Sequence, residues 1–240
     1  MLTPAALGQL QRGYGSADWS QWQNFRWQQY DYVRYPTAGA TQLQFFTVGL
    51  GGADPNNATV PKTLEQTNLT ASGQFGQVGT LITQIRMHAR ILPKGRQPAG
   101  ISDDADVLWT TISNMMSKFV ELLRRGVLQI SIQSKEYFTI SEPLRTCPPG
   151  FGINIQQNGS SFIAAGNAWI TFTAWAQQNP DLDNVFYVDP PQFIEPAQTF
   201  VAQMIYPDGT GPVFTTLVSG ASPLIDVGLI FDGYIVRPMT

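Results

Sequence analysis

The sequence predicts a mainly β protein whose strands form an antiparallel β-sandwich. Short segments of alternating apolar and polar residues recur through most of the chain, and clusters of glycine and proline separate them. One segment, near the middle of the chain, has the clear spacing of an amphipathic helix, so the strand–helix alternation that produces parallel sheets is absent. The length of 240 residues suits one large β domain, because sandwiches of about 200–250 residues are common as single units.

The clearest strand is predicted over Thr80–Leu92. One face would carry Leu81, Thr83, Ile85, Met87, Ala89 and Ile91, and the other, more polar face would carry Ile82, Gln84, Arg86, His88 and Arg90. The strand pattern begins near Leu43, and the other candidates are Thr67–Phe75, Val127–Gln133, Glu136–Ile140, Phe151–Ile155, Ala168–Trp175, Val185–Val188, Thr199–Tyr206 and Leu224–Val236. About eight to ten strands favour a sandwich, of which the eight-stranded jelly roll is a leading form.

Glycine and proline positions predict where strands stop. Gly228 and the pair Asp232-Gly233 are expected to break the last strand. Pro190-Pro191 is expected at a turn or a sheet edge, because proline cannot donate to a hydrogen-bonded ladder.

One amphipathic α-helix is predicted from Asp104 to Arg125. Ser102, Asp103 and Asp104 are candidate N-caps, and Gly126 is a candidate C′ residue. Its apolar stripe, at spacings of four and three, is Leu108, Ile112, Met115, Phe119 and Leu122.

Residues 1–40 are predicted to be an N-terminal arm that acts as an aromatic-rich assembly segment, and residues 41–240 the β domain. Asp18 would cap a short helix from Trp19 to about Tyr30. Tryptophan and tyrosine bury a large area while a polar tip stays wet, which suits an interface. The candidate interface residues are Trp19, Trp22, Arg26, Trp27 and Tyr30. The alternative, that these aromatic residues pack on the subunit's own sheet, stays open.

The charge content favours self-assembly. Charged residues make up 13% of the chain, roughly half the usual share of about 25%. A free monomer normally needs more charge for solubility, so the composition fits a surface that copies of the chain cover. The net charge is −3 without a basic run, so we expect no sequence-specific nucleic-acid partner.

Reactive groups are few, and we predict that the protein is not an enzyme and holds no cofactor or metal. The sequence has one cysteine, Cys147, and one histidine, His88, which excludes the usual Cys/His zinc site. His88 is interpreted as a structural strand residue. A Ser/His/Asp set remains formally possible, although there is no G-x-S-x-G motif. Neither a signal peptide nor a transmembrane segment is expected.

Four pieces of sequence, in this order, resemble the major capsid proteins of tailless icosahedral DNA bacteriophages, including those with an internal membrane. They are Thr67–Gln74 running into Leu81–Arg86, the segment Leu122–Gly126 followed by Leu128–Ile132, the stretch from Lys135–Phe138 through Pro148–Gly152, and the ending Phe231–Pro238.

The resemblance implies a viral jelly roll that stands in an icosahedral shell around a phage genome, usually as trimers. It implies that the partners are copies of the same chain and other capsid or vertex proteins, with a membrane beneath the shell in some members, and that the location is the virion. A single jelly roll is favoured over two fused ones, because two would need about sixteen strands in roughly 200 residues.

The alternative function from a different class is a jelly-roll carbohydrate-binding protein of the lectin type. Its tryptophans, Trp169 and Trp175, would stack on sugars. Particle mass separates the two, because a capsid protein forms very large particles and a lectin forms small oligomers.

Overall fold

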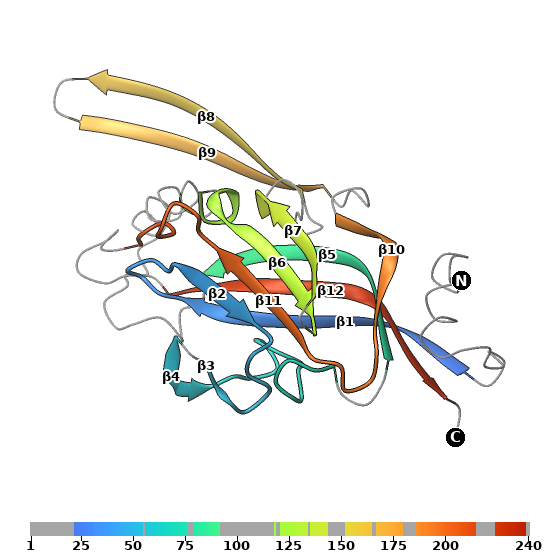
Figure 1. Cartoon of the computed structure of the whole chain (residues 1–240). Helices are drawn as coiled ribbons and strands as arrows, with labels where there is room; N and C mark the ends of the chain where they lie inside the picture. The colour runs from blue at the N-terminus through green and yellow to red at the C-terminus, as the bar shows by residue number, and fades with distance from the viewer. Residues whose placement is uncertain are drawn as a thin grey trace.

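Over the residues that the structure describes, the fold is mainly β, with two larger antiparallel sheets, two small two-stranded sheets and little helix (Figure 1). The computed structural model describes residues 22–54, 56–75, 79–91, 118, 121–133, 135–143, 152–164, 167–179, 186–214 and 224–238. Its strands are β1 (Trp22–Tyr35), β2 (Gln42–Phe45), β3 (Ala53–Asp54), β4 (Asn57–Pro61), β5 (Gly79–Ile91), β6 (Val127–Ile132), β7 (Lys135–Ser141), β8 (Gly152–Ala164), β9 (Asn167–Asn179), β10 (Phe186–Ile194), β11 (Phe200–Ile205) and β12 (Ile225–Pro238).

In the two larger sheets, strands near the two ends of the sequence pair with each other, and strands nearer its middle pair with each other in turn. One sheet has the order β1-β12-β5-β10 and the other the order β2-β11-β6-β7. Leaving aside the small sheets β3-β4 and β8-β9, the first strand pairs with the last, the second with the second-last, and so on to β6 with β7. The chain therefore follows one long antiparallel hairpin whose strand pairs alternate between the two sheets.

A single hydrophobic cluster takes side chains from both sheets. Its members include Val33, Ile85, Met87, Val227 and Leu229 from one sheet and Leu43, Phe45, Leu128, Ile130, Ala202 and Met204 from the other. Burial of such side chains is the main source of stability, because each removes apolar area from water.

Four phenylalanines, Phe46, Phe75, Phe200 and Phe231, pack against one another within the core. The Phe46 ring stacks on Phe231 with centroids 5.1 Å apart, and the Phe75 and Phe200 centroids are 4.3 Å apart. Phe46 has a positive φ of 59°, which is uncommon for a residue other than glycine. The turn after β2 brings this fully buried ring between the sheets, so the packing holds a backbone conformation that is unfavourable in isolation.

The predicted strand over Thr80–Leu92 is confirmed as β5, but its two faces switch partway along. Ile85 and Met87 point into the core as expected, whereas Ile82 is in the core cluster and Leu81 is not. The cause is a bulge, since Gln84 pairs with Asp232 while Ile82 pairs with Gly233, which leaves Thr83 unpaired.

The prediction that Gly228 and Asp232-Gly233 break the last strand is wrong, because β12 runs unbroken from Ile225 to Pro238. The glycines instead make room within the sheet. A Cβ on Gly228 would lie 2.3 Å from the Tyr32 ring, and one on Gly233 would lie 1.8 Å from the Leu81 carbonyl oxygen. The bulge is what brings that carbonyl so close.

Most other predicted strands are confirmed, although β8, β9 and β10 are longer than their candidates. Pro190 and Pro191 lie in β10, an edge strand of its sheet, as expected. The predicted strand Thr67–Phe75 is wrong, because this segment consists of turns with isolated bridges at Thr67 and between Ala71 and Gln74. Its turns place Leu69 in the core without a strand ladder.

The end of the predicted helix is present, since Glu121–Arg125 is helical and Leu122 and Leu123 are buried. The residues from Asp104 to Ser117, with Phe119 and the candidate N-caps, lie outside the described residues. Gly126 does not have the positive φ of a C′ cap. A glycine is needed at this position because a Cβ there would lie 2.6 Å from the Met204 sulfur.

The helix predicted from Trp19 to Tyr30 is wrong over its described part, because Trp22–Tyr35 is the 14-residue strand β1. β1 pairs with β12 along its whole length, from Trp22 opposite Pro238 to Tyr35 opposite Ile225. A division of the chain between residues 40 and 41 therefore does not separate this segment from the sheet. The part of the predicted arm before Trp22, including Trp19, lies outside the described residues.

Replacing Gly233 with alanine should destabilise the fold by about 3 kcal/mol, because the new methyl group overlaps a backbone carbonyl that cannot rotate away. Chemical denaturation measures the loss. Gly51→Ala is the control, since it combines a φ of +80° with no neighbour within 4 Å and should cost only about 1 kcal/mol. Equal losses in the two variants would contradict the close approach at the bulge.

Candidate functional site: strand β1 and its polar contacts

The predicted interface residues that the structure describes lie in β1, between Trp22 and Tyr30. Arg26 and Trp27 are exposed, with 44% of Trp27 accessible, and Tyr30 is half-buried. Trp22 is also in β1, although its side chain is outside the described residues. Trp27 donates a hydrogen bond from Nε1 to Gln29 Oε1 at 3.2 Å, and the Tyr30 hydroxyl donates one to the Leu64 carbonyl.

The strand places these residues on two faces and not on one. Side chains alternate along β1, and its pairing with β12 has no bulge, so Arg26 and Tyr30 share the face away from the core. Trp27 points to the same side as the core residues Val33 and Tyr35. The predicted helix would have placed Arg26 on one side with Trp27 and Tyr30 close by, whereas the strand puts Trp27 on the opposite face from Arg26 and Tyr30.

The outer edge of β1 is closed from Gln28 to Arg34 by a connecting segment, residues 54–68. The Tyr32 N–H donates to the Gln66 carbonyl at 2.6 Å, and Asn56 Nδ2 donates to the Arg34 carbonyl at 3.0 Å. The side chain of Asn68 bonds to both neighbours, accepting from Tyr30 N at 3.0 Å and donating to the Gln28 carbonyl at 2.7 Å. Backbone groups bonded in this way cannot pair with a strand of another chain.

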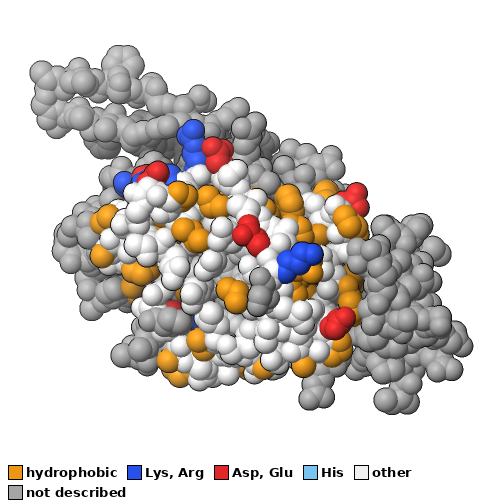
Figure 2. Space-filling view, viewed as in Figure 1, with side chains coloured by type: hydrophobic (Ala, Val, Ile, Leu, Met, Phe, Trp, Pro, Cys, Tyr) orange, Lys and Arg blue, Asp and Glu red, His pale blue; other side chains and the backbone are white. Residues whose placement is uncertain are grey.

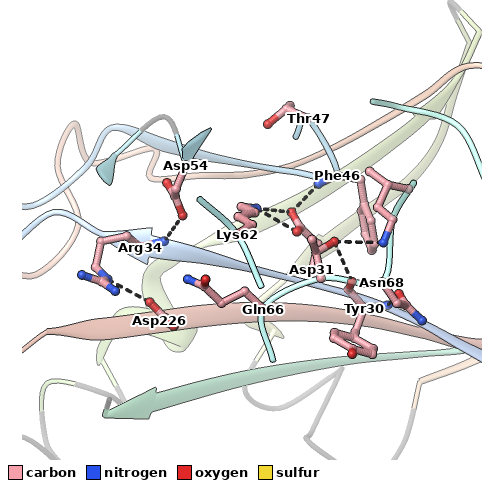
Figure 3. A network of polar contacts seen from close by, with 12 residues as sticks. Tyr30, Asp31, Arg34, Phe46, Thr47, Asp54, Lys62, Gln66, Asn68 and Asp226 are labelled. Carbon is pink, nitrogen blue, oxygen red and sulfur yellow. Dashed lines mark hydrogen bonds and ion pairs between the residues drawn. The ribbon is translucent and has the colours of Figure 1, made fainter. Parts of the chain in front are cut away.

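A buried ion pair joins this segment to β1 (Figure 3). Lys62 Nζ lies 2.7 Å from Asp31 Oδ1 and 3.0 Å from Oδ2, and neither side chain is exposed. Asp31 Oδ2 also accepts the Phe46 N–H at 2.7 Å. Burial raises the pKa of the Asp31 carboxyl more than the charge of Lys62 and the hydrogen bonds lower it.

Sequence reasoning missed this ion pair because Asp31 was assigned to the arm and Lys62 to no predicted element. The available signal was the alternation itself. Asp31 occupies an inward position between Gln29 and Val33, and all three are buried. A carboxylate at an inward strand position needs a cation as partner, because an unpaired buried charge is very costly.

A second set of ion pairs covers the face of the β1-β12-β5 sheet that points away from the core. Arg86 binds Asp232 through Nε at 2.6 Å and Nη2 at 2.9 Å. Asp226 Oδ1 accepts a hydrogen bond from Arg34 Nε at 2.8 Å, and Asp226 Oδ2 lies 3.6 Å from Arg90 Nη2. Since these charges neutralise one another within the sheet, they fix strand register.

The single histidine lies within this charged face. His88 Nδ1 is 3.4 Å from the Tyr32 hydroxyl, and the Arg90 guanidinium lies 3.9 Å from the centre of the Tyr32 ring. Burial lowers the pKa of His88 below its ordinary value near 6.5, and the positive charges of Arg90 and Arg86 lower it further. This environment fits the prediction of a structural strand residue, since a neutral imidazole packs beside two cations.

The described residues contain no group of three or more histidine, cysteine, aspartate or glutamate side chains placed to hold a metal ion. In the same part of the chain, no helix has the length and apolar character needed to cross a membrane. Comparisons with protein-family models, with curated proteins and with solved structures find no match.

Removing one charge of the buried pair should be costly, because the other charge would remain buried without a partner. Lys62→Met should lower the free energy of unfolding by about 3–5 kcal/mol. Adding Asp31→Asn to Lys62→Met should recover part of this loss, since the amide oxygen still accepts the Phe46 N–H. Denaturant unfolding of the single and double variants measures both steps, and additive losses would show that the two side chains are not coupled.

The depressed pKa of His88 should make stability depend on pH. The unfolded chain binds a proton near pH 6.5 more readily than the folded chain, so the free energy of unfolding should fall as pH drops from 7.5 to 5.5. The slope for one proton is at most about 1.4 kcal/mol per pH unit.

His88→Gln should remove this slope, and because the chain has one histidine the difference between the two proteins isolates it. The raised pKa of Asp31 acts in the opposite direction, with stability lost as pH rises, but it is common to both proteins. Identical pH profiles would contradict the assignment to His88.

Proposed function

We propose that the chain is a structural subunit of an icosahedral virus shell and that its fold is a single jelly roll. The observation that carries the proposal is the strand pairing β1 with β12, β2 with β11, β5 with β10 and β6 with β7. An eight-stranded hairpin rolled into two sheets is the arrangement of a jelly roll, which occurs in capsid proteins and lectins. Because one roll uses all strands of the two larger sheets, the pairing supports one jelly roll over two.

The surface composition supports a self-assembling protein over one that stays monomeric in solution. Charged residues are 13% of the chain, and several of those in the described part are buried in internal ion pairs. Large apolar side chains are exposed at the same time, namely Phe25, Trp27, Leu50, Leu64, Tyr137, Tyr187, Val201 and Val213. Contact with neighbouring copies would cover such a surface.

The β8–β9 hairpin adds a second argument. It pairs only within itself, as a two-stranded sheet with 13 residues in each strand, and Figure 1 shows it standing away from the two larger sheets. Strands of this length span about 40 Å. Because an isolated two-stranded hairpin is marginally stable in water, packing against an adjacent subunit would stabilise it.

In this proposal the partners are copies of the chain, arranged as trimers in the shell, together with other capsid or vertex proteins and an underlying membrane where the shell has one. The location is the virion, and the role is structural and not catalytic. Arg26, Trp27 and Tyr30 belong to the contact surface of β1. The closed edge from Gln28 to Arg34 restricts that contact to side chains and to the N-terminal part of the strand.

The decisive measurement is the mass of the particles that the purified full-length chain forms. Sedimentation and electron microscopy should find closed shells of megadalton mass, and Trp27→Ser should reduce their yield under conditions in which unfolding measurements show that the variant is still folded. Gln133→Ser, at an exposed residue outside β1 and outside the set of exposed apolar side chains, is the control. Small oligomers that bind sugars would contradict the capsid proposal and favour the lectin-type alternative.

A further inference from the structure

The outer face of the β2-β11-β6-β7 sheet, on the side away from the core, carries no charged side chain across its central strands. This outer amide face consists of Gln42, Gln44, Val127, Gln129, Ser131, Thr139, Ser141, Val201, Gln203 and Ile205, and Glu136, which is paired with Ser131, lies on the same face at its β7 edge. In Figure 1 these strands lie in front, and the same view in Figure 2 shows mostly uncharged side chains, with few charged ones. The opposite sheet differs, because its outer face is covered by arginine–aspartate pairs.

The strand register aligns the amides into one row. Gln203 of β11 is paired with Gln44 of β2 on one side and with Gln129 of β6 on the other, and Gln129 is paired with Thr139 of β7. Residues that are directly opposite in neighbouring strands have adjacent side chains on the same face. The row therefore crosses the full width of the sheet.

Within the described part of the chain, the row makes two side-chain hydrogen bonds: Gln203 Nε2 donates to Gln129 Oε1 at 3.2 Å, and the Thr139 hydroxyl donates to Glu136. Each carboxamide has two donors and an acceptor oxygen, so among the described residues most of the capacity of the three glutamines is unused. A face with equal access to donors and acceptors can bond to an identical face. It offers no counter-charge to phosphate groups or lipid headgroups, which would need lysine or arginine.

The surroundings of the row have the composition of an interface. Val127, Ile205 and the 49% exposed Val201 provide apolar area beside it, while Lys135 and Glu136 lie at the end of β7. An uncharged centre with charges at the rim is typical of protein–protein contacts. The sheet face covers about 400 Å², half of the ~800 Å² per partner in a standard interface, so one contact alone would be weak.

We propose that the outer amide face is a contact between two copies of this chain, with the amide row of one copy against the amide row of the other. The inference deepens the proposed shell function, in which many weak contacts add to a stable assembly. A second copy fits better than a charged partner because the central strands of the face are uncharged and their amides are self-complementary.

The test places one charge at the centre of the row. Gln203→Lys and Gln203→Glu should each weaken self-association by about tenfold or more, because like charges would meet across the contact. An equimolar mixture of the two variants should restore association, since opposite charges then meet. Gln133→Lys, in the exposed turn between β6 and β7, is the matched control and should associate as the unaltered chain does. Sedimentation velocity over a concentration series measures all five samples.

The outcomes separate this inference from the proposed function. Unaltered association of Gln203→Lys would overturn the inference, and megadalton particles in the same experiment would leave the shell proposal standing. Weakened variants whose mixture stays weak would also overturn it, because the face would then meet a different surface. Charge-dependent association that stops at small oligomers would support the inference and contradict the shell. A strictly monomeric chain would overturn both.

Discussion

The buried ion pair between Asp31 and Lys62 is the contact on which the arrangement of the two sheets depends. Asp31 lies in β1, in one sheet, and also accepts the N–H of Phe46, which directly follows β2 of the other sheet. Lys62 follows β4 in the segment that closes the edge of β1. One carboxylate therefore joins both sheets and their connection, and because it is fully buried its bonds act in a medium of low polarity, where a missing partner is most costly.

The positive φ of Phe46 follows from this constraint. The ion pair fixes the backbone at the end of β2, and the Phe46 ring then stacks on Phe231 of β12. The aromatic cluster fills the space between the sheets only while that turn is held. The polar contacts and the hydrophobic packing therefore stabilise the same turn after β2. The hydrogen bond from the Phe46 N–H to Asp31 holds its backbone, and the stacking of the Phe46 ring on Phe231 holds its side chain.

Sequence periodicity predicted the mainly β class and most strands, because alternation reports directly on a sheet with one buried face. It failed for β1, whose inward positions include Gln29 and Asp31 and whose many aromatic residues conceal the alternation. It also failed at Gly233, since a glycine that admits a neighbouring carbonyl at a bulge has the same local signal as one that ends a strand. Both failures have one physical reason: the partner that explains the residue is distant in sequence.

Contacts within the chain also decide which of its surfaces are available to a neighbouring subunit. Along Gln28–Arg34 the edge of β1 is occupied by backbone and side-chain hydrogen bonds from residues 54–68. The outer face of the β1-β12-β5 sheet is occupied by its own arginine–aspartate pairs. The centre of the outer amide face has hydrogen-bonding groups left over and no charged side chain, and its charges, Lys135 and Glu136, lie at the β7 edge. A chain with this distribution gains more from contact with a neutral, self-complementary surface than with an ionic one, because no ion needs to be removed from water when the surfaces meet.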